Sequence, residues 1–270
     1  CILCIRLALL RALHLSRSCG NGKGKMASVD LEDLSKSIRI VLITPNLLQP
    51  WMSVVEFPIG GAIEDNSLVQ SFSVYKAPFL VDLKKPESTI AHTMNFFLRS
   101  EPGVRLGIWH TVPSCREEDA KGKGRCWYED ALHDGNPIIV YLHGSAQHRA
   151  ASHRVKLAKV LSDGGFHVLS VDYRGFGDST GMPTEEGLTT DTICVYEWTK
   201  ARSGRTPVCL WGHSLGTGVA TNAARVLEAK GCPVDAIVLE APFTNMWVAT
   251  INYPLLKSWS VYYGRHKGFF

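Results

Sequence analysis

From residue 104 to residue 239, short apolar runs alternate with longer stretches of helical spacing. The runs 137–142 and 166–171 are rich in Val, Ile and Leu, which is typical of strands buried on both faces of a sheet. The alternation predicts an α/β fold with a mostly parallel sheet and helices on both faces. The expected strands are 104–112, 137–142, 166–171, 207–211 and 234–239, and the expected helices are 151–162, 188–202 and 215–230.

The segment Gly212-His213-Ser214-Leu215-Gly216 joins the expected strand 207–211 to the following helix. A G-x-S-x-G pattern at such a junction is typical of a nucleophile elbow, a sharp turn that exposes the serine hydroxyl. Gly212 and Gly216 let the strand and the helix approach each other closely. Ser214 is therefore the candidate catalytic nucleophile. The alternative is that it only caps the helix.

A second turn, His143-Gly144-Ser145-Ala146, directly follows the strand 137–142. In hydrolases with a nucleophile elbow, this loop supplies one backbone N–H of the oxyanion hole, and the residue after the nucleophile supplies the other. We therefore expect the N–H groups of Ser145 and Leu215 to form the hole. Gly144 leaves room for the approaching substrate. The alternative is an ordinary turn after a strand.

A serine nucleophile also needs a base and an orienting acid, which in this architecture follow the serine as acid, then histidine. Only 56 residues follow Ser214, which is short for two further strand–helix units of about 30 residues each. His143 and His213 are interpreted as structural. Glu240 is expected to anchor a loop, and His266 is not expected to replace the base. The sequence therefore predicts negligible esterase activity for this chain by itself.

The segment 172–179 directly follows the expected strand 166–171 and is interpreted as scaffold rather than as catalytic. Its two glycines permit a turn. The side chains of Asp172 and Arg174 are expected to hydrogen-bond neighbouring loops.

Composition narrows the class of protein only modestly. The net charge is +4 and no dense Lys/Arg block occurs, so no nucleic-acid partner is predicted, although a mildly basic surface is compatible with anionic lipid. Eight cysteines are scattered along the chain without zinc-type pairing, so no metal or other cofactor is predicted. Cys194 and Cys209 fall in core-type patterns and are expected to be free, buried thiols.

The ends of the chain differ in character from its middle. Residues 1–75 are interpreted as an N-terminal extension, in which the apolar stretch 38–63 contains prolines and favours an interfacial or loop-like segment over a membrane-spanning helix. Residues 76–257 form the expected partial α/β domain, and 258–270 a divergent tail. Within the domain, 114–125 is expected to be a surface loop. The strand 234–239 is expected to form an exposed sheet edge, which would favour self-association.

Several motifs together resemble one known family. The chain is similar to the lysophosphatidylserine lipase branch of the α/β-hydrolase-domain proteins over roughly residues 76–257. The tail after about Lys257 departs from the family pattern. The segments that carry the resemblance are Val81–Pro86, Ile108–Pro113, Tyr141–Gly144, Asp172–Ser179, Trp211–Asn222 and Glu240–Asn245.

The resemblance implies an α/β-hydrolase fold that lacks its last strand–helix units. It also implies a serine hydrolase that acts on lysophospholipids or monoacylglycerols through an acyl-enzyme on Ser214, in association with the endoplasmic reticulum membrane. A cytoplasmic location is the alternative. Two other functions stay open: a truncated, inactive product or binding protein, and a peptidase of the serine aminopeptidase type. The sequence does not indicate the oligomeric state, the acyl length or the head group.

Overall fold

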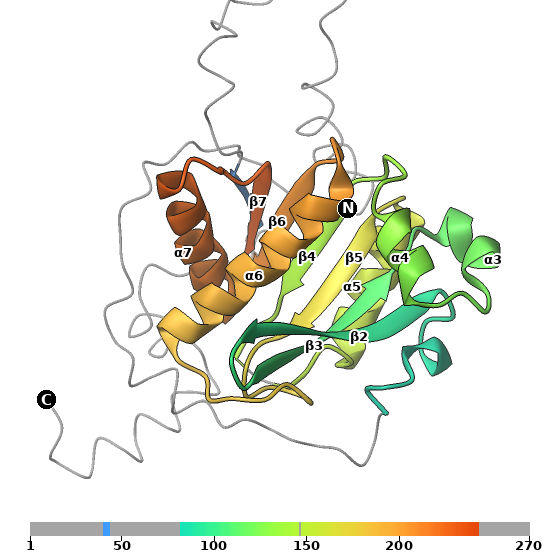
Figure 1. Ribbon diagram of the computed structural model, residues 1–270, viewed down its shortest axis with the longest axis horizontal. Coiled ribbons are helices and arrows are strands. Elements are labelled where there is room, and N and C mark those ends of the chain that lie inside the picture. The colour runs from blue at the N-terminus through green and yellow to red at the C-terminus, as the bar shows by residue number, and fades with distance from the viewer. Residues whose placement is uncertain (1–39, 44–81, 146, 243–270) are drawn as a thin grey trace, which may run out of the picture.

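The computed structural model describes residues 40–43, 82–145 and 147–242 (Figure 1). These residues form one seven-stranded sheet in the order β1-β7-β6-β4-β5-β3-β2. The strands are β1 (Ile40–Ile43), β2 (Thr93–Glu101), β3 (Val104–Thr111), β4 (Ile138–Leu142), β5 (His167–Asp172), β6 (Val208–His213) and β7 (Ala236–Glu240). The helices are η2 (Pro86–Ser88), η3 (Ser114–Arg116), α3 (Glu117–Ala120), α4 (Arg125–Ala131), α5 (Ser152–Asp163), α6 (Glu185–Ser203) and α7 (Leu215–Ala229).

The strands from β1 to β5 in this order run parallel, and β3 and β2 continue the sheet in antiparallel fashion. Leu142 pairs with Gly212, and Gly212 pairs with Leu239, so β4, β6 and β7 end at the same level. We call this the carboxyl edge of the sheet, and the opposite side, where β4 and β5 begin, the amino edge. Ligand sites of open α/β sheets lie at the carboxyl edge.

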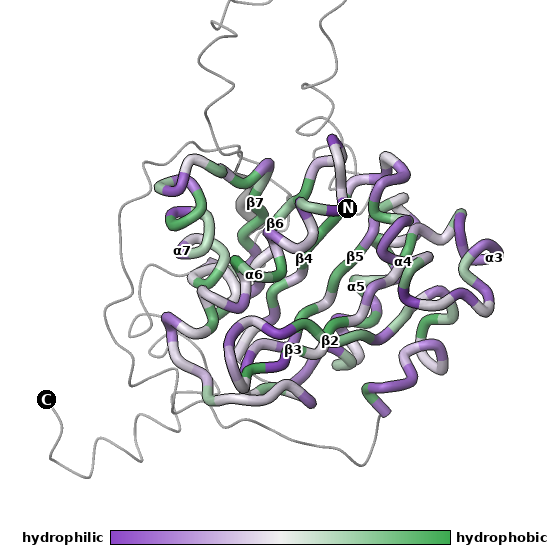
Figure 2. The backbone as a smooth tube through the Cα atoms, in the orientation of Figure 1, coloured by the Kyte–Doolittle hydropathy of each residue, from purple (hydrophilic) through white to green (hydrophobic). Residues whose placement is uncertain are grey.

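Both faces of the sheet are covered because successive side chains of each strand point to opposite sides. Ile138, Val140 and Leu142 of β4 belong to the core shared with α6 and α7, whereas Ile139 and Tyr141 belong to the core shared with α5. Figure 2 shows hydrophobic residues along the central strands and hydrophilic residues around α3. The predicted fold, a mostly parallel sheet between helices, is therefore confirmed.

Each strand and helix expected between residues 104 and 239 is present, with ends shifted by a few residues. The expectation of a plain surface loop over 114–125 is wrong, because η3, α3 and the start of α4 occupy it. The acidic run Glu117-Glu118-Asp119 lies in the first turn of α3, where negative charge favours a helix. The sequence pattern also does not indicate β2, because its polar and apolar positions alternate irregularly.

The prediction that the strand 234–239 ends the sheet is also wrong. Ile40 pairs with Ile237, and Ile43 pairs with Glu240, in a parallel ladder beside β7. The strand comes from the segment that was expected to be interfacial or loop-like. Its Ile-Val-Leu-Ile sequence has high strand propensity, and an unpaired sheet edge offers it a row of hydrogen-bonding groups.

The rest of the N-terminal extension and the tail 258–270 lie outside the described residues, so the predicted domain boundaries stay predictions. In the part of the chain that the structure describes, no helix has the length and apolar character needed to cross a bilayer. The same residues contain no group of His, Cys, Asp and Glu side chains suited to a metal ion. Cys209 is buried as expected, whereas Cys194 on α6 is only half-buried.

Candidate active site

Ser214 is the single residue between β6 and α7, where the chain turns sharply from strand into helix. Its φ of 50° and ψ of −116° are unusual for a residue with a side chain, and such strain costs about 1–3 kcal/mol. Its N–H donates to the Glu240 carbonyl at 2.9 Å, and its own carbonyl accepts the Thr217 N–H at 2.8 Å. These bonds hold the turn that the G-x-S-x-G pattern predicts.

The glycines on either side of Ser214 are required by close backbone approach. A Cβ atom at Gly212 would meet the backbone of Gly216, and one at Gly216 would meet the carbonyl oxygen of Leu142. Backbone cannot move aside as a flexible side chain can. Both glycines are therefore needed for α7 to start directly against the ends of β4 and β6.

The loop after β4 lies beside the nucleophile turn. A Cβ at Gly144 would lie 3.4 Å from the Cβ of Ser214 and 3.0 Å from Nδ1 of His213. The fold therefore brings Gly144, and with it the peptide to Ser145, against Ser214. Leu215, the other predicted oxyanion donor, is the first residue of α7. The direction of the two N–H groups toward a reacting oxygen stays a prediction.

The side chain of Ser214 makes no capping hydrogen bond to α7 in the described part of the chain. An N-cap serine uses its hydroxyl oxygen to accept an N–H from the first turn of the helix. The alternative interpretation of Ser214 as a simple helix cap therefore has no support in the structure.

His213 directly precedes Ser214 in the chain, and Glu240 contacts Ser214 through the backbone. Burial lowers the pKa of His213, and the nearby Glu240 carboxylate only partly offsets that effect. The Glu240 carboxylate accepts the indole N–H of Trp211 at 3.0 Å. Glu240 thus anchors the ends of β6 and β7 through both its backbone and its side chain, as expected. No histidine occurs between residues 215 and 242, so a base that follows Ser214 would lie outside the described residues.

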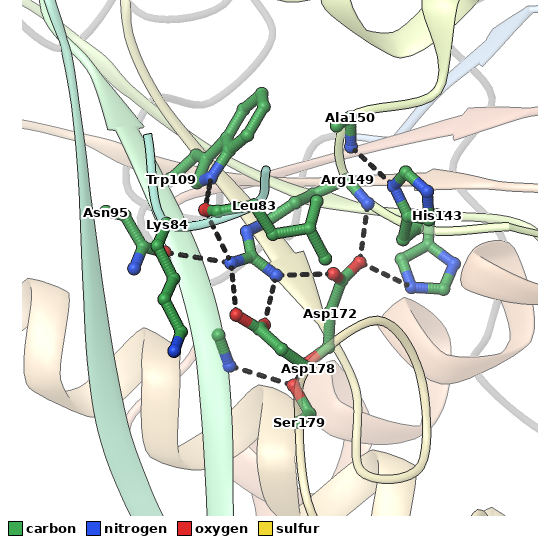
Figure 3. Close-up of polar contacts among 12 residues, drawn as sticks. Leu83, Lys84, Asn95, Trp109, His143, Arg149, Ala150, Asp172, Asp178 and Ser179 are labelled. Atoms are coloured by element: carbon green, nitrogen blue, oxygen red, sulfur yellow. Dashed lines mark hydrogen bonds and ion pairs between the residues drawn. The ribbon is translucent and has the colours of Figure 1, made fainter. Parts of the chain in front are cut away.

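A buried ion-pair network, which the sequence analysis missed, fixes the loop after β4 (Figure 3). Arg149 donates its backbone N–H and its Nη1 to the two carboxylate oxygens of Asp172, each at 2.6 Å. Nη1 also reaches Asp178 at 2.7 Å, and Nη2 reaches Asn95 Oδ1 at 2.8 Å. Both members of the Arg149–Asp172 pair are fully buried. The polar run after Gly144 gave no periodic signal that would single out Arg149.

The expectation that the side chains of Asp172 and Arg174 hydrogen-bond neighbouring segments is confirmed. Arg174 donates Nη2 to Asp191 of α6 at 2.7 Å and to Glu101 of β2 at 2.6 Å. The Ser179 hydroxyl donates to the Asp172 carbonyl at 2.7 Å. The segment that follows β5 thus joins α6, β2 and the loop after β4.

A second serine, Ser162 of α5, contacts a histidine but has no free proton to lose. Ser162 Oγ donates to the Val112 carbonyl at 2.8 Å, so Nε2 of His92 must donate to Ser162 at 2.8 Å. Nδ1 of His92 lies 3.6 Å from Glu117. The order Ser–His–Glu is that of a catalytic triad, but the donor directions are reversed and Ser162 is buried. This set is structural.

The comparisons with known proteins agree with the fold. A family model described as serine aminopeptidase, S33, matches residues 134–265. Protein ABHD12B of Homo sapiens is 87% identical over 186 residues, which are 69% of this chain and 51% of that protein. The chain belongs to the α/β-hydrolase-domain proteins, a family of serine hydrolases.

The relatives with a stated activity are more distant. Lysophosphatidylserine lipase ABHD12 of Rattus norvegicus is 50% identical over 195 residues, which are 72% of this chain and 48% of that protein. The chain thus spans about half the length of the curated relatives it matches. A solved esterase of Pyrococcus furiosus is 20% identical, with a TM-score of 0.42, over 58% of this chain and 52% of that one.

Proposed function

We propose that this chain carries the nucleophile and the oxyanion hole of a lipase or esterase that hydrolyses lysophospholipids, such as lysophosphatidylserine, or monoacylglycerols. The observation that carries the proposal is the strained turn at Ser214, at the carboxyl edge and against Gly144. The activity printed for the relatives that are about 50% identical supports the lipid ester as substrate.

In the proposed reaction, Ser214 Oγ attacks the ester carbonyl carbon while its proton passes to a base. The N–H groups of Ser145 and Leu215 bind the negative oxygen that forms, and each such donor is worth about 10²–10³ in turnover. The lysolipid head group or glycerol leaves with the proton from the base. Water then hydrolyses the acyl-enzyme and frees Ser214.

The proposal is tested with the protein expressed from its complete reading frame in cell membranes. We expect a fluorophosphonate probe to label the protein at Ser214, and lysophosphatidylserine hydrolysis to exceed the background of untransfected membranes. Ser214→Ala should abolish both signals. Ser162→Ala is the matched control, since it removes a buried serine that also contacts a histidine, and it should leave both signals in place. Equal signals from wild type and Ser214→Ala would refute the proposal.

The head group is decided in the same assay by comparing two substrates of equal acyl length. Faster release of fatty acid from lysophosphatidylserine than from a monoacylglycerol would assign the lysophospholipid. The small positive charge of the chain is compatible with an anionic head group.

A peptidase is the second candidate, and the description of the matching family model favours it. Aminopeptidases of this type share the elbow, so the fold alone does not separate the two activities. Release of an aromatic amine from aminoacyl anilides, lost on Ser214→Ala, would assign the peptidase. A protein that reacts with neither class of substrate and with no probe would instead be a lipid- or protein-binding member of the family.

We also propose that the protein associates with the endoplasmic reticulum membrane, which rests on the family resemblance alone. Membrane fractionation tests this directly. Recovery of the protein in the high-speed supernatant after mild lysis would support the cytoplasmic alternative.

A further inference from the structure

The histidine before Gly144 contacts the same peptide group that carries the predicted oxyanion donor. His143 is fully buried, and its Nδ1 lies 2.7 Å from the carbonyl oxygen of Gly144. A carbonyl oxygen only accepts, so Nδ1 must carry the hydrogen. This contact fixes the position of the proton on the ring.

The segment that follows β5 also holds the ring of His143. The ring packs against Tyr173 and Phe176, with ring centroids 4.5 Å and 5.0 Å away. The Tyr173 hydroxyl donates to the backbone carbonyl of His143 at 3.2 Å. Backbone and side chain of His143 are therefore both fastened to the segment that follows β5.

The charge state of His143 follows from its surroundings. Burial, and then the nearby cation of Arg154, hold the pKa of His143 well below its ordinary value despite the bond to Gly144. The ring is neutral near pH 7, with its hydrogen on Nδ1. Its Nε2 lies 3.4 Å from Asp172 Oδ1 and has no hydrogen-bond partner among the described residues.

In a trans peptide the C=O and the following N–H point in opposite directions, and the described residues contain only trans peptides. A group that holds the Gly144 carbonyl therefore also sets the direction of the Ser145 N–H. We infer that His143 is a positioning residue, whose Nδ1–H fixes the Gly144–Ser145 peptide so that the Ser145 N–H faces the oxyanion formed at Ser214. This role rests on the proposed function, and His143 would act on the reaction through the backbone.

The test compares side chains that do and do not place a donor at Nδ1, in the protein expressed from its complete reading frame with lysophosphatidylserine as substrate. The carboxamide N–H of His143→Asn can occupy the Nδ1 position, whereas that of His143→Gln reaches beyond it. We expect His143→Gln and His143→Leu to lower kcat by about 10²-fold with KM nearly unchanged. His143→Asn should stay within several-fold of wild type.

His167→Leu is the matched control, because it removes another fully buried, hydrogen-bonded histidine at the amino edge. It should lower the melting temperature and leave kcat unchanged. If His143→Gln is as active as His143→Asn, or if kcat follows the melting temperature through all variants, His143 only fills space and the inference is wrong. Wild type that is no more active than Ser214→Ala would instead remove the proposed function, and this inference with it.

Discussion

The two edges of the parallel sheet differ in structure: the carboxyl edge has strained backbone turns, and the amino edge has a chain of hydrogen-bonded side chains. In the described part of the chain, the non-glycine residues with positive φ are Gln147, Ser214 and Ala241. Each lies at the carboxyl edge, in the turn or loop that follows a parallel strand. At the amino edge, His110 Nε2 lies 3.0 Å from His167 Nδ1, and His167 Nε2 lies 3.2 Å from both oxygens of Asp134.

At the amino edge, the side chains of His110, His167 and Asp134 are hydrogen-bonded to one another. Asp134 only accepts, so His167 donates to it from Nε2, and a single hydrogen is shared between Nδ1 of His167 and Nε2 of His110. Two buried histidines and a carboxylate thus form a continuous chain of hydrogen bonds. The carboxyl edge instead holds its backbone in strained turns, which is where reactive groups are commonly placed. Residue type alone therefore does not distinguish a structural histidine or serine from a functional one.

The largest expected effect is the loss of stability on replacing Arg149, the buried cation at the carboxyl edge. Arg149→Met leaves the carboxylates of Asp172 and Asp178 without their partner and should destabilise the protein by about 3–5 kcal/mol. Urea denaturation of the pure protein measures the loss. The control is Arg125→Met, which removes a surface ion pair with Glu129 and should change stability by about 1 kcal/mol or less. Similar losses from both variants would show that the buried network is not what holds this edge.

The next effect tests the close approach of α7 to β4. Gly216→Val places side-chain atoms against the Leu142 carbonyl and should cost about 1–3 kcal/mol, together with loss of probe labelling at Ser214. Gly124→Ala is the control, since a Cβ there meets nothing within 4 Å. A labelled, stable Gly216→Val variant would show that the turn tolerates a wider strand–helix spacing.

A smaller effect tests the amino edge. Burial by itself raises the pKa of the Asp134 carboxyl, but hydrogen bonds from His167, the Asn136 N–H and Arg116 leave it below its usual range. A lowered carboxyl pKa stabilises the fold above the unfolded value near 4 and loses that stability as the pH falls through the folded value. Asp134→Asn should therefore cost about 1–3 kcal/mol at pH 7, and the difference from wild type should shrink below about pH 4.

That pH dependence is checked by urea midpoints at several pH values. A difference between wild type and Asp134→Asn that is constant from pH 7 to pH 3 would show that the carboxylate charge does not matter. The loss of stability in Asp134→Asn would then come from changed hydrogen-bond geometry alone.

The smallest expected effect concerns His110. Burial, and then the neighbouring His167, hold the pKa of His110 well below its ordinary value. The unfolded chain therefore binds a proton that the folded protein does not, and stability falls as the pH drops below about 6.5. His110→Gln should reduce that fall by at most about 1.4 kcal/mol per pH unit, the limit for one proton. The slope is measured from urea midpoints at several pH values, and a slope that His110→Gln leaves unchanged would contradict the prediction.

The sequence alone predicted those parts of the fold that depend on near neighbours. Hydrophobic periodicity indicates β4, β5 and α7 because a buried strand or an amphipathic helix repeats within a few residues. The turn at Ser214 was predictable for the same reason, since its two glycines and its strand and helix are adjacent in the chain. The backbone N–H and C=O groups along β7, by contrast, do not indicate which distant segment pairs with them. For that reason β1 was not predicted.

What only the tertiary structure decided are contacts between residues far apart in the chain. Arg149 binds Asp172 and also Leu83, which is 66 residues away, and its full burial marks it as structural only once those partners are known. The same is true of the histidines, since His110 and His167 are 57 residues apart. Local spacing determines where the backbone turns and which faces are apolar. The partner of each buried polar group depends on which strands lie side by side, and that is a property of the packed sheet.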